Sequence, residues 1–155
     1  GNDIGIATLG GLNYNKTLLN ISHFKKLSKN IILATRLQYA AFNPSGNSSG
    51  GKTFEIESFK IGGPTTLRGY SSLNPFSGEQ KALSNIEIRY QLLKSFQTIL
   101  FYDTGNTADI DENFAQFKMG YGIGFRYLTP VGPLRLDIAQ GNQDLYIHIG
   151  LGQIF

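Results

Sequence analysis

Four charged residues are the strongest candidates for chemistry in this sequence. Arg68 lies in a long connection, and the carboxylates of Glu87, Asp103 and Asp137 follow on segments in which polar and apolar residues alternate. An arginine in a long loop of a β protein is ordinarily solvated. If the loop folds back into an interior, however, a guanidinium can form bidentate and geometrically specific bonds with carboxylates, which a lysine cannot reproduce. The chemistry on offer is therefore a buried ion pair.

Other patterns do not support catalysis. Residues 46–50 match the G-x-S-x-G expression, but they lie in a Ser/Gly-rich loop between expected antiparallel strands, where no strand-to-helix elbow can form. Asp109, Asp111 and Asn113 have the spacing of a calcium loop, but Phe114 stands where that loop requires glycine. The chain has no cysteine, which excludes thiol chemistry. We expect no catalytic, metal or cofactor site, and a chain that is not an enzyme.

Composition also narrows the class of partner. The 14 Lys and Arg are scattered along the chain and the net charge is only +3, so a nucleic-acid partner is not indicated. No apolar stretch approaches the ~20 residues of a membrane helix. If the chain crosses a bilayer, it does so as strands. It opens on Gly1-Asn2-Asp3, with no signal-peptide features, so its start resembles a processed or cut end.

The elements that position the charged residues are predicted to be strands. In residues 81–93, Ile86, Ile88 and Tyr90 share one face while Glu87 and Arg89 share the other, which is the period of a β-strand. The same alternation recurs along the chain. It predicts an all-β antiparallel meander with strands near 17–27, 30–42, 53–61, 81–93, 96–105, 117–128, 131–140 and 145–155, and a further short or truncated strand at 3–12.

Alternation alone fits both a soluble barrel and a membrane barrel, since the apolar face can turn inward or toward lipid. Three features favour an antiparallel transmembrane β-barrel. Short connections alternate with long ones, and the polar faces carry glycines, as at Gly120, Gly122 and Gly124, which leave room for something packed inside. Aromatic residues near strand ends fit an interfacial girdle; they are Tyr39, Tyr90, Tyr102, Tyr127 and Phe155.

The order of several motifs resembles a known family. Gly62-Gly63 followed by Leu67-Arg68-Gly69-Tyr70 resembles the signature loop of the BamA/TamA outer-membrane assembly superfamily, the bacterial surface antigen family. Residues 101–105 resemble its F-x-D-x-G strand, and residues 122–126 and 129–135 resemble its G-x-G-x-R and T-P-x-G-P-x-R hairpin. The resemblance runs from Phe54 to Phe155.

The resemblance implies a fold and a site. Residues 1–155 would be the C-terminal portion of an outer-membrane barrel, supplying about eight strands of about 16. The loop at about 62–80 would fold inward, with Arg68 contacting Glu87 and Asp103. The strand 145–155 would pair weakly with the first strand of the complete barrel, forming a lateral seam. Gly152 and Phe155 would belong to a terminal insertion signal, from which Gln153 departs as a polar residue.

The resemblance also implies a function, which is insertion or translocation of outer-membrane proteins through the lateral seam. The expected partners are outer-membrane lipid, unfolded outer-membrane protein substrates, and periplasmic domains or accessory proteins outside this chain. The expected location is the bacterial outer membrane. Two alternatives stay open: a barrel anchor for a passenger such as a patatin-like lipase domain, and a small autonomous structural or adhesive barrel. A closed barrel of about eight strands has room only for side chains, so a second copy completing the barrel is a further possibility.

Overall fold

The computed structural model describes residues 2–11, 14–44, 58–142 and 144–155. These residues form strands and connections between them. The strands are β1 (Asn2–Gly11), β2 (Tyr14–Lys26), β3 (Ile31–Pro44), β4 (Phe59–Ile61), β5 (Phe76–Gly78), β6 (Gln80–Leu93), β7 (Phe96–Ala108), β8 (Lys118–Thr129), β9 (Gly132–Gln140) and β10 (Leu145–Leu151). No helix in this described part is long and apolar enough to cross a membrane.

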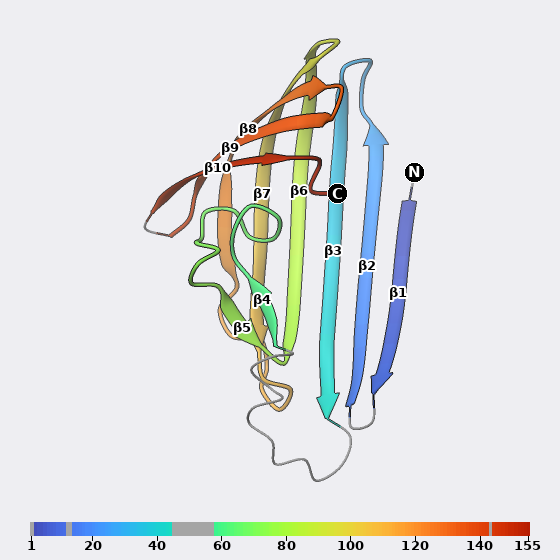
Figure 1. Ribbon diagram of the computed structural model, residues 1–155, viewed down its shortest axis with the longest axis vertical. Helices are drawn as coiled ribbons and strands as arrows, with labels where there is room; N and C mark the ends of the chain where they lie inside the picture. Colours follow the sequence, from blue (N-terminus) through green and yellow to red (C-terminus); the bar gives the residue numbers. More distant parts are fainter. Residues whose placement is uncertain (1, 12–13, 45–57, 143) are drawn as a thin grey trace.

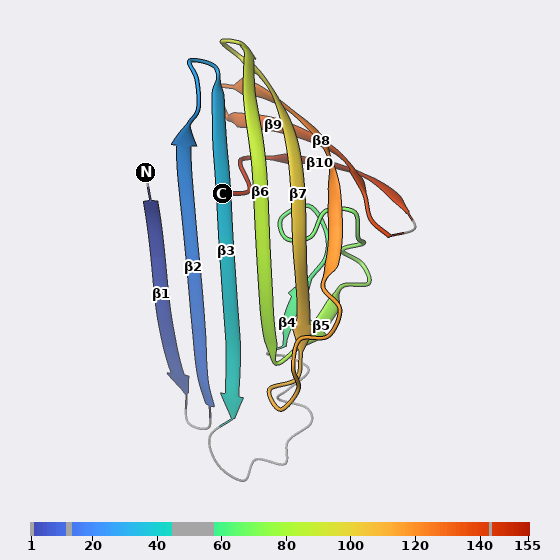
Figure 2. The same cartoon turned by 180° about the vertical axis from the view of Figure 1, so that it is seen from behind.

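Eight of the strands form one curved sheet in the order β1-β2-β3-β6-β7-β8-β9-β10, in which every neighbouring pair is antiparallel. β4 and β5 pair only with each other and lie on the concave side of this sheet, which we call the lumen (Figures 1 and 2). The sheet ends at β1 on one side and β10 on the other. The described strands therefore form an all-β antiparallel wall that is open at two edges.

The expected strand at 53–61 is wrong in its role. Its described part is the three-residue β4, which pairs with β5 inside the lumen, and residues 53–57 lie outside the described residues. Phe59 and Ile61 alternate with the exposed Lys60 because they pack against the inner wall. Alternation cannot distinguish a strand of the wall from a hairpin packed on it. The eighth wall strand is instead β1, at the segment expected to be short or truncated.

The two faces of the wall have the polarity of a membrane barrel. Ile86, Ile88 and Tyr90 on the convex face are 40%, 44% and 42% exposed, whereas Glu87 and Asp103 on the lumen face are 1% and 0% exposed. A soluble barrel would place the apolar row in its core and the carboxylates in water. Here the apolar row faces outward, where a bilayer covers it.

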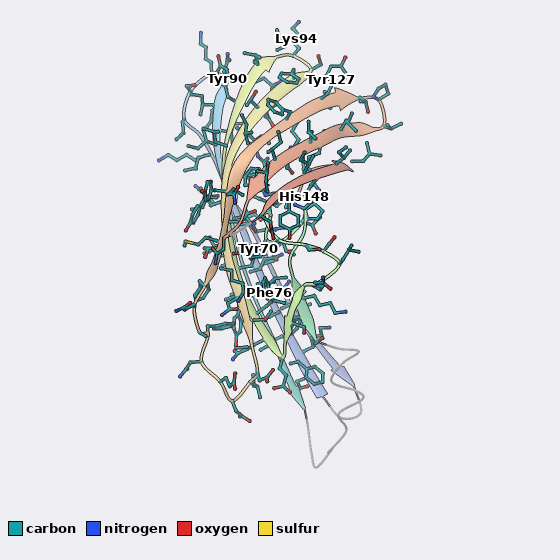
Figure 3. The ribbon with its side chains drawn as sticks, turned by 90° about the vertical axis from the view of Figure 1, so that its left-hand side faces the viewer. Tyr70, Phe76, Tyr90, Lys94, Tyr127 and His148 are labelled. Atoms are coloured by element: carbon teal, nitrogen blue, oxygen red, sulfur yellow. The ribbon has the colours of Figure 1, made fainter. Side chains whose placement is uncertain are left out.

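The ends of the wall also differ, as the pattern of connections predicted. The short connections 27–30, 94–95 and 130–131 lie together at one end, and the longer connection 109–117 between β7 and β8 lies at the other (Figure 1). Tyr90 and Tyr127 gather near the short-turn end, beside Lys94 (Figure 3). Both tyrosines are exposed, which fits an interfacial girdle at this end of the wall.

The last wall strand is shorter than expected. β10 ends at Leu151, and residues 152–155, predicted to continue it, leave the sheet. Gly152 has a φ of +89°, a conformation that favours glycine, and its N–H still donates to the Pro133 carbonyl at 2.8 Å. The chain then turns toward β3, beside which its end lies in Figures 1 and 2.

Candidate functional site

The loop between β4 and β5 is shaped by glycines. Gly62 and Gly63 have φ values of +136° and +93°, and a Cβ on Gly62 would lie 2.7 Å from the Ser71 carbonyl oxygen. The Gly63 N–H donates to the Tyr70 carbonyl at 3.0 Å, and the Thr66 hydroxyl donates to the Gly62 carbonyl at 3.0 Å. Because only glycine combines these dihedrals with this close approach, the two residues define the entry to the loop.

Apolar residues attach the loop to the lumen wall. Leu67 is fully buried in a cluster with Ile61 of β4 and Leu83 of β6. Tyr70 and Phe76 pack against this cluster, and their rings lie 5.3 Å apart in an edge-to-face arrangement (Figure 3). Burial of these side chains places Arg68 against the charged inner faces of β6 and β7.

Arg68 has no solvent exposure and bridges two carboxylates on neighbouring wall strands. Its Nε and Nη2 donate to Asp103 Oδ2 and Oδ1, both at 2.7 Å, in the bidentate geometry of a guanidinium with a carboxylate. Its Nη1 donates to Glu87 Oε1 at 2.8 Å. The structure therefore brings Arg68, Glu87 and Asp103 together, with β6 and β7 tied to one loop side chain.

Two further contacts fix the guanidinium. The Arg68 main-chain N–H donates to Asp103 Oδ2 at 3.1 Å, and the guanidinium carbon lies 3.6 Å from the centroid of the Phe101 ring. Burial alone would lower the pKa of the Arg68 guanidinium. The hydrogen bond and charge of Asp103, followed by the charge of Glu87, outweigh that effect and raise the pKa above its ordinary value. The Arg68 guanidinium therefore stays protonated.

Missing side chains let the loop lie against the wall. Of the three polar-face glycines Gly120, Gly122 and Gly124, only Gly120 meets the loop, and a Cβ on either of the other two would meet atoms of the wall. A Cβ on Gly69 would lie 2.7 Å from both the Gln140 carbonyl oxygen and the Gly141 nitrogen. A Cβ on Gly120 would overlap the Arg68 carbonyl oxygen, and a Cβ on Gly141 would overlap the Gly69 carbonyl oxygen. These contacts require glycine on both surfaces, so the loop approaches β8 and the end of β9 through its main chain.

Asp137, which the sequence offered as a third acceptor for Arg68, pairs elsewhere. Its Oδ1 accepts a hydrogen bond from Arg126 Nη1 at 2.6 Å, and its Oδ2 lies 3.4 Å from Arg135 Nε. Asp137 and Arg135 both lie on β9, and Arg126 lies on the neighbouring strand β8. The two nearer carboxylates on β6 and β7 already use every nitrogen of the Arg68 guanidinium.

Three lumen residues that sequence reasoning missed extend the bridge. Asn85 Nδ2 donates to Asp103 Oδ1 at 2.7 Å, and Asn85 Oδ1 accepts from Arg36 Nη2 at 2.7 Å. Arg89 Nε donates to Glu87 Oε2 at 2.8 Å. The signal for them was present, because Asn85 and Arg89 share the polar face of 81–93 with Glu87. What the sequence could not supply was the pairing of β3 with β6.

Phe155, expected on the outward apolar face, lies in the lumen. The guanidinium carbons of Arg36 and Arg89 lie 4.9 and 5.1 Å from the centroid of its ring. The Phe24 ring centroid lies 6.2 Å away. The reason is the turn at Gly152, which takes the last residues out of the alternating pattern of β10.

The site has the features of a structural brace. Glu87 and Asp103 are matched by Arg68 and Arg89, so the buried carboxylates are neutralised and hydrogen-bonded, as buried charges must be. Removing the arginines would leave the buried carboxylates without a cation, and removing the carboxylates would leave the buried guanidinium groups without an anion. In the described ranges, no three His, Asp or Glu side chains gather as a metal site would require. The arrangement holds a loop against a wall and specifies its position.

Comparison with known proteins agrees with this architecture. The chain superposes on the crystal structure of BamA from Haemophilus ducreyi lacking POTRA domains 1–3, with a TM-score of 0.77 and 18% sequence identity. The match covers 97% of this chain and 37% of that chain. At this identity the likeness shows the fold, which is that of part of a larger barrel.

Sequence comparison gives relatives in plants. The chain is 32% identical over 122 residues to the chloroplastic outer envelope protein 80 of Arabidopsis thaliana, covering 72% of this chain and 17% of that protein. It is 28% identical over 105 residues to outer envelope protein 39 of the same plant, covering 61% of this chain and 29% of that protein. The chain thus spans less than a third of either relative. A model of the Omp85 superfamily domain matches all of residues 1–155, so the chain belongs to the Omp85 superfamily.

Proposed function

We propose that this chain is the C-terminal half of an outer-membrane barrel that inserts or translocates outer-membrane proteins through a seam beside β10. The proposal rests chiefly on one observation: a short edge strand stands next to a wall that is braced from within. β10 has only seven residues and is the last strand of the sheet, whereas the strands of the braced region, β6 and β7, have 14 and 13. Membership of the Omp85 superfamily supports it.

The edge of β10 supplies the physical basis of insertion. An edge strand presents main-chain N–H and C=O groups that can pair with an incoming strand, a mode of recognition called β-augmentation. Leu145, Ile147, Ile149 and Leu151 alternate outward and are 62–73% exposed, so a strand paired with β10 would continue the apolar outer face. In this proposal the seam of the complete barrel uses this seven-residue strand, so opening it breaks a shorter ladder than opening β6–β7 or β7–β8 would.

The Arg68 bridge has a complementary role in the proposal. A seam can open repeatedly only if the rest of the wall keeps its curvature. Arg68 joins the inserted loop to Glu87 on β6 and Asp103 on β7, several strands away from β10. We assign the loop glycines and Arg68 to bracing, and Gly152 and Phe155 to the terminal signal for insertion of the protein itself.

A seam-locking experiment tests the proposal. In the full-length protein, Ile147→Cys is combined with a cysteine on the facing residue of the first barrel strand, and the purified protein is reconstituted in liposomes. Oxidation should stop the folding of an added unfolded outer-membrane protein, and reductant should restore it. Unchanged folding with the seam fully oxidised would refute insertion through this seam.

A matched control uses strands that never separate. Ile138 and Ile147 are register partners on β9 and β10, so a disulfide between Ile138→Cys and Ile147→Cys leaves the seam free. Oxidation of this pair should leave insertion unchanged. It also shows that the chemistry itself does not inactivate the protein.

The alternatives give different outcomes. A barrel that only anchors a passenger, such as a patatin-like lipase domain, needs no seam opening, so locking the seam would leave passenger activity intact. A small autonomous barrel would have to pair β1 with β10, whereas these are the two ends of the sheet. A second copy completing the barrel would double the mass of the assembly in detergent.

The proposal also specifies the membrane in which the chain lies and the molecules that it contacts. The convex face contacts outer-membrane lipid, unfolded outer-membrane proteins are the substrates, and periplasmic domains or accessory proteins act from outside this chain. Family membership places the chain in an outer membrane. We propose the bacterial outer membrane, and a plastid outer envelope is the alternative that the names of the plant relatives raise.

A further inference from the structure

The terminal residues 152–155 occupy a site in the lumen wall that is built from two arginines. Arg36 Nη1 donates to the Ile154 carbonyl at 3.1 Å, and Arg89 Nη2 donates to the Phe155 main-chain oxygen at 3.0 Å. The Phe155 ring lies near both guanidinium groups. Both arginines are at least nine-tenths buried, with exposures of 6% and 8%. Their positions on β3 and β6 lie several strands away from β10 in the sheet.

The wall gives the chain a physical reason to leave the sheet at this point. Leu151 is paired with Leu134 of β9, so the next residue meets Pro133, which has no N–H to donate. The Pro133 carbonyl accepts from Gly152, and the ladder then ends. Gly152 adopts its positive φ immediately afterwards, which directs residues 153–155 into the lumen.

Two chains of hydrogen bonds join this site to Arg68. In the first, Arg68 and Asn85 both donate to Asp103 Oδ1 at 2.7 Å, and Asn85 Oδ1 accepts from Arg36. Arg36 Nη2 also donates to the Thr65 carbonyl of the loop at 2.8 Å. Every hydrogen bond in this series is buried or part-buried, and each involves a charged side chain. The Asn85 amide is held through both its oxygen and its nitrogen. Each side chain therefore orients the next one in the series.

The second chain runs through one carboxylate. Glu87 accepts from Arg68 Nη1 on Oε1 and from Arg89 Nε on Oε2, both at 2.8 Å. With both oxygens engaged, the Glu87 side chain holds Arg89 in the orientation that reaches Phe155. Loss of Arg68 would release Glu87 from one side and leave Arg89 as its only cation in the bridge.

We propose that Arg36 and Arg89 form a binding site for the chain's own terminal segment, residues 152–155, and that docking of this segment depends on the Arg68 bridge. The ligand class is an aromatic side chain together with two main-chain carbonyl oxygens. The two hydrogen-bond chains make the loop and the end of the seam strand one coupled unit. This proposal stands on contacts within the wall and does not depend on what the barrel inserts.

Crosslinking of the terminal segment to the wall tests the proposal. Gln91 and Gln153 line one cavity of about 120 Å³ together with Arg126. Undocking of the segment would move Gln153 away from Gln91. Gln91→Cys and Gln153→Cys are introduced into the full-length protein in an otherwise cysteine-free background. The rate of joining by a short bis-maleimide is then measured in detergent, and heat-modifiability on gels shows that each variant is folded.

The expected results separate docking from coupling. Arg89→Gln removes a charged donor, so the docked-to-undocked ratio should fall about tenfold or more. Arg68→Lys, which touches no residue of the segment, should lower the ratio as well. Lys81→Gln is the control, because Lys81 is a lumen cation that lies over the Phe59 ring, and it should leave the crosslinking rate unchanged.

Three outcomes would overturn the proposal. An unchanged rate in Arg89→Gln would show that the arginine does not hold the segment. An unchanged rate in Arg68→Lys, with Arg89→Gln slowed, would show that docking is independent of the bridge. An equal fall in Lys81→Gln would show a general loosening of the lumen. If Arg68→Lys does not fold, Glu87→Gln takes its place. The glutamine is similar in size to the glutamate, and it disrupts the series of hydrogen bonds that runs through Glu87.

Discussion

Replacement of Arg68 by alanine is the sharpest test of the bridge. The substitution removes three guanidinium hydrogen bonds of 2.7–2.8 Å and the contact with the Phe101 ring. Glu87 retains Arg89, and Asp103 retains Asn85 and the residue 68 main-chain N–H, so the carboxylates are only partly compensated. Breaking a buried ion pair from one side costs about 3–5 kcal/mol. We expect a loss in this range, which is at least about a hundredfold in the unfolding equilibrium constant.

The loss is measured from the urea midpoint of the heat-modifiable folded form in detergent. Lys94→Ala is the matched control, because Lys94 is an exposed cation in a short turn and its loss should change stability by at most about 0.5 kcal/mol. Arg68→Lys should recover only part of the loss, since an ammonium cannot meet Asp103 in a bidentate manner and reach Glu87 as well.

A double-mutant cycle makes the result specific. If Arg68 acts through Glu87, then Glu87→Gln should cost less in the Arg68→Ala background than in the parent, with a coupling energy of about 1 kcal/mol or more. Strict additivity, or a stability of Arg68→Ala within the range of Lys94→Ala, would contradict the reasoning. In either case the buried geometry would carry no stabilising coupling.

Two further predictions address the glycines and the outward face. Gly69→Ala should destabilise the barrel by more than the about 1–3 kcal/mol of a strained positive φ, because the new Cβ would also lie 2.7 Å from the Gln140 carbonyl oxygen. Gly132 also has a positive φ but has open space around it, so Gly132→Ala should show the cost of strain alone. Equal losses in urea midpoint for the two variants would contradict the predicted clash. Ile147→Arg should cost about 2–4 kcal/mol of stability if the residue faces lipid near the bilayer midplane. His148→Arg, on the lumen face of the same strand, should cost less. The folding yields of the two variants in liposomes are compared, and a lower yield for His148→Arg would show that the two faces are assigned the wrong way round.

Much of the wall could be predicted from the sequence because strand period is a local property. Residues such as Ile86 and Ile88 fall on one face and Glu87 and Arg89 on the other in any extended chain. The same local reasoning failed at 53–61, where Phe59 and Ile61 alternate in a lumen hairpin. Alternation in the sequence indicates that one face of a strand is buried, but it does not indicate which part of the protein covers that face.

The site shows the same division. The place of Arg68 in a long connection singled it out, and the polar faces offered Glu87, Asp103 and Asp137 as acceptors. Alternation could not choose among these three carboxylates, and only the resemblance to family motifs narrowed them to Glu87 and Asp103. Asp137 is removed from the bridge because β8 and β9 bring Arg126 and Arg135 to it. Partner choice depends on strand neighbours, which are set by pairing.

The sequence by itself determined that the chain is a set of antiparallel strands with one apolar face, that glycines line the other face, and that an arginine interrupts a long loop. Those features depend on residue type and on a repeat of two, which need no folding to be read. Only the tertiary structure decided that the apolar face is convex, that Arg36 and Asn85 join the bridge, and that Phe155 turns inward. Each of these depends on contacts between residues far apart in the chain, which strand pairing and the folding of the loop into the lumen bring together.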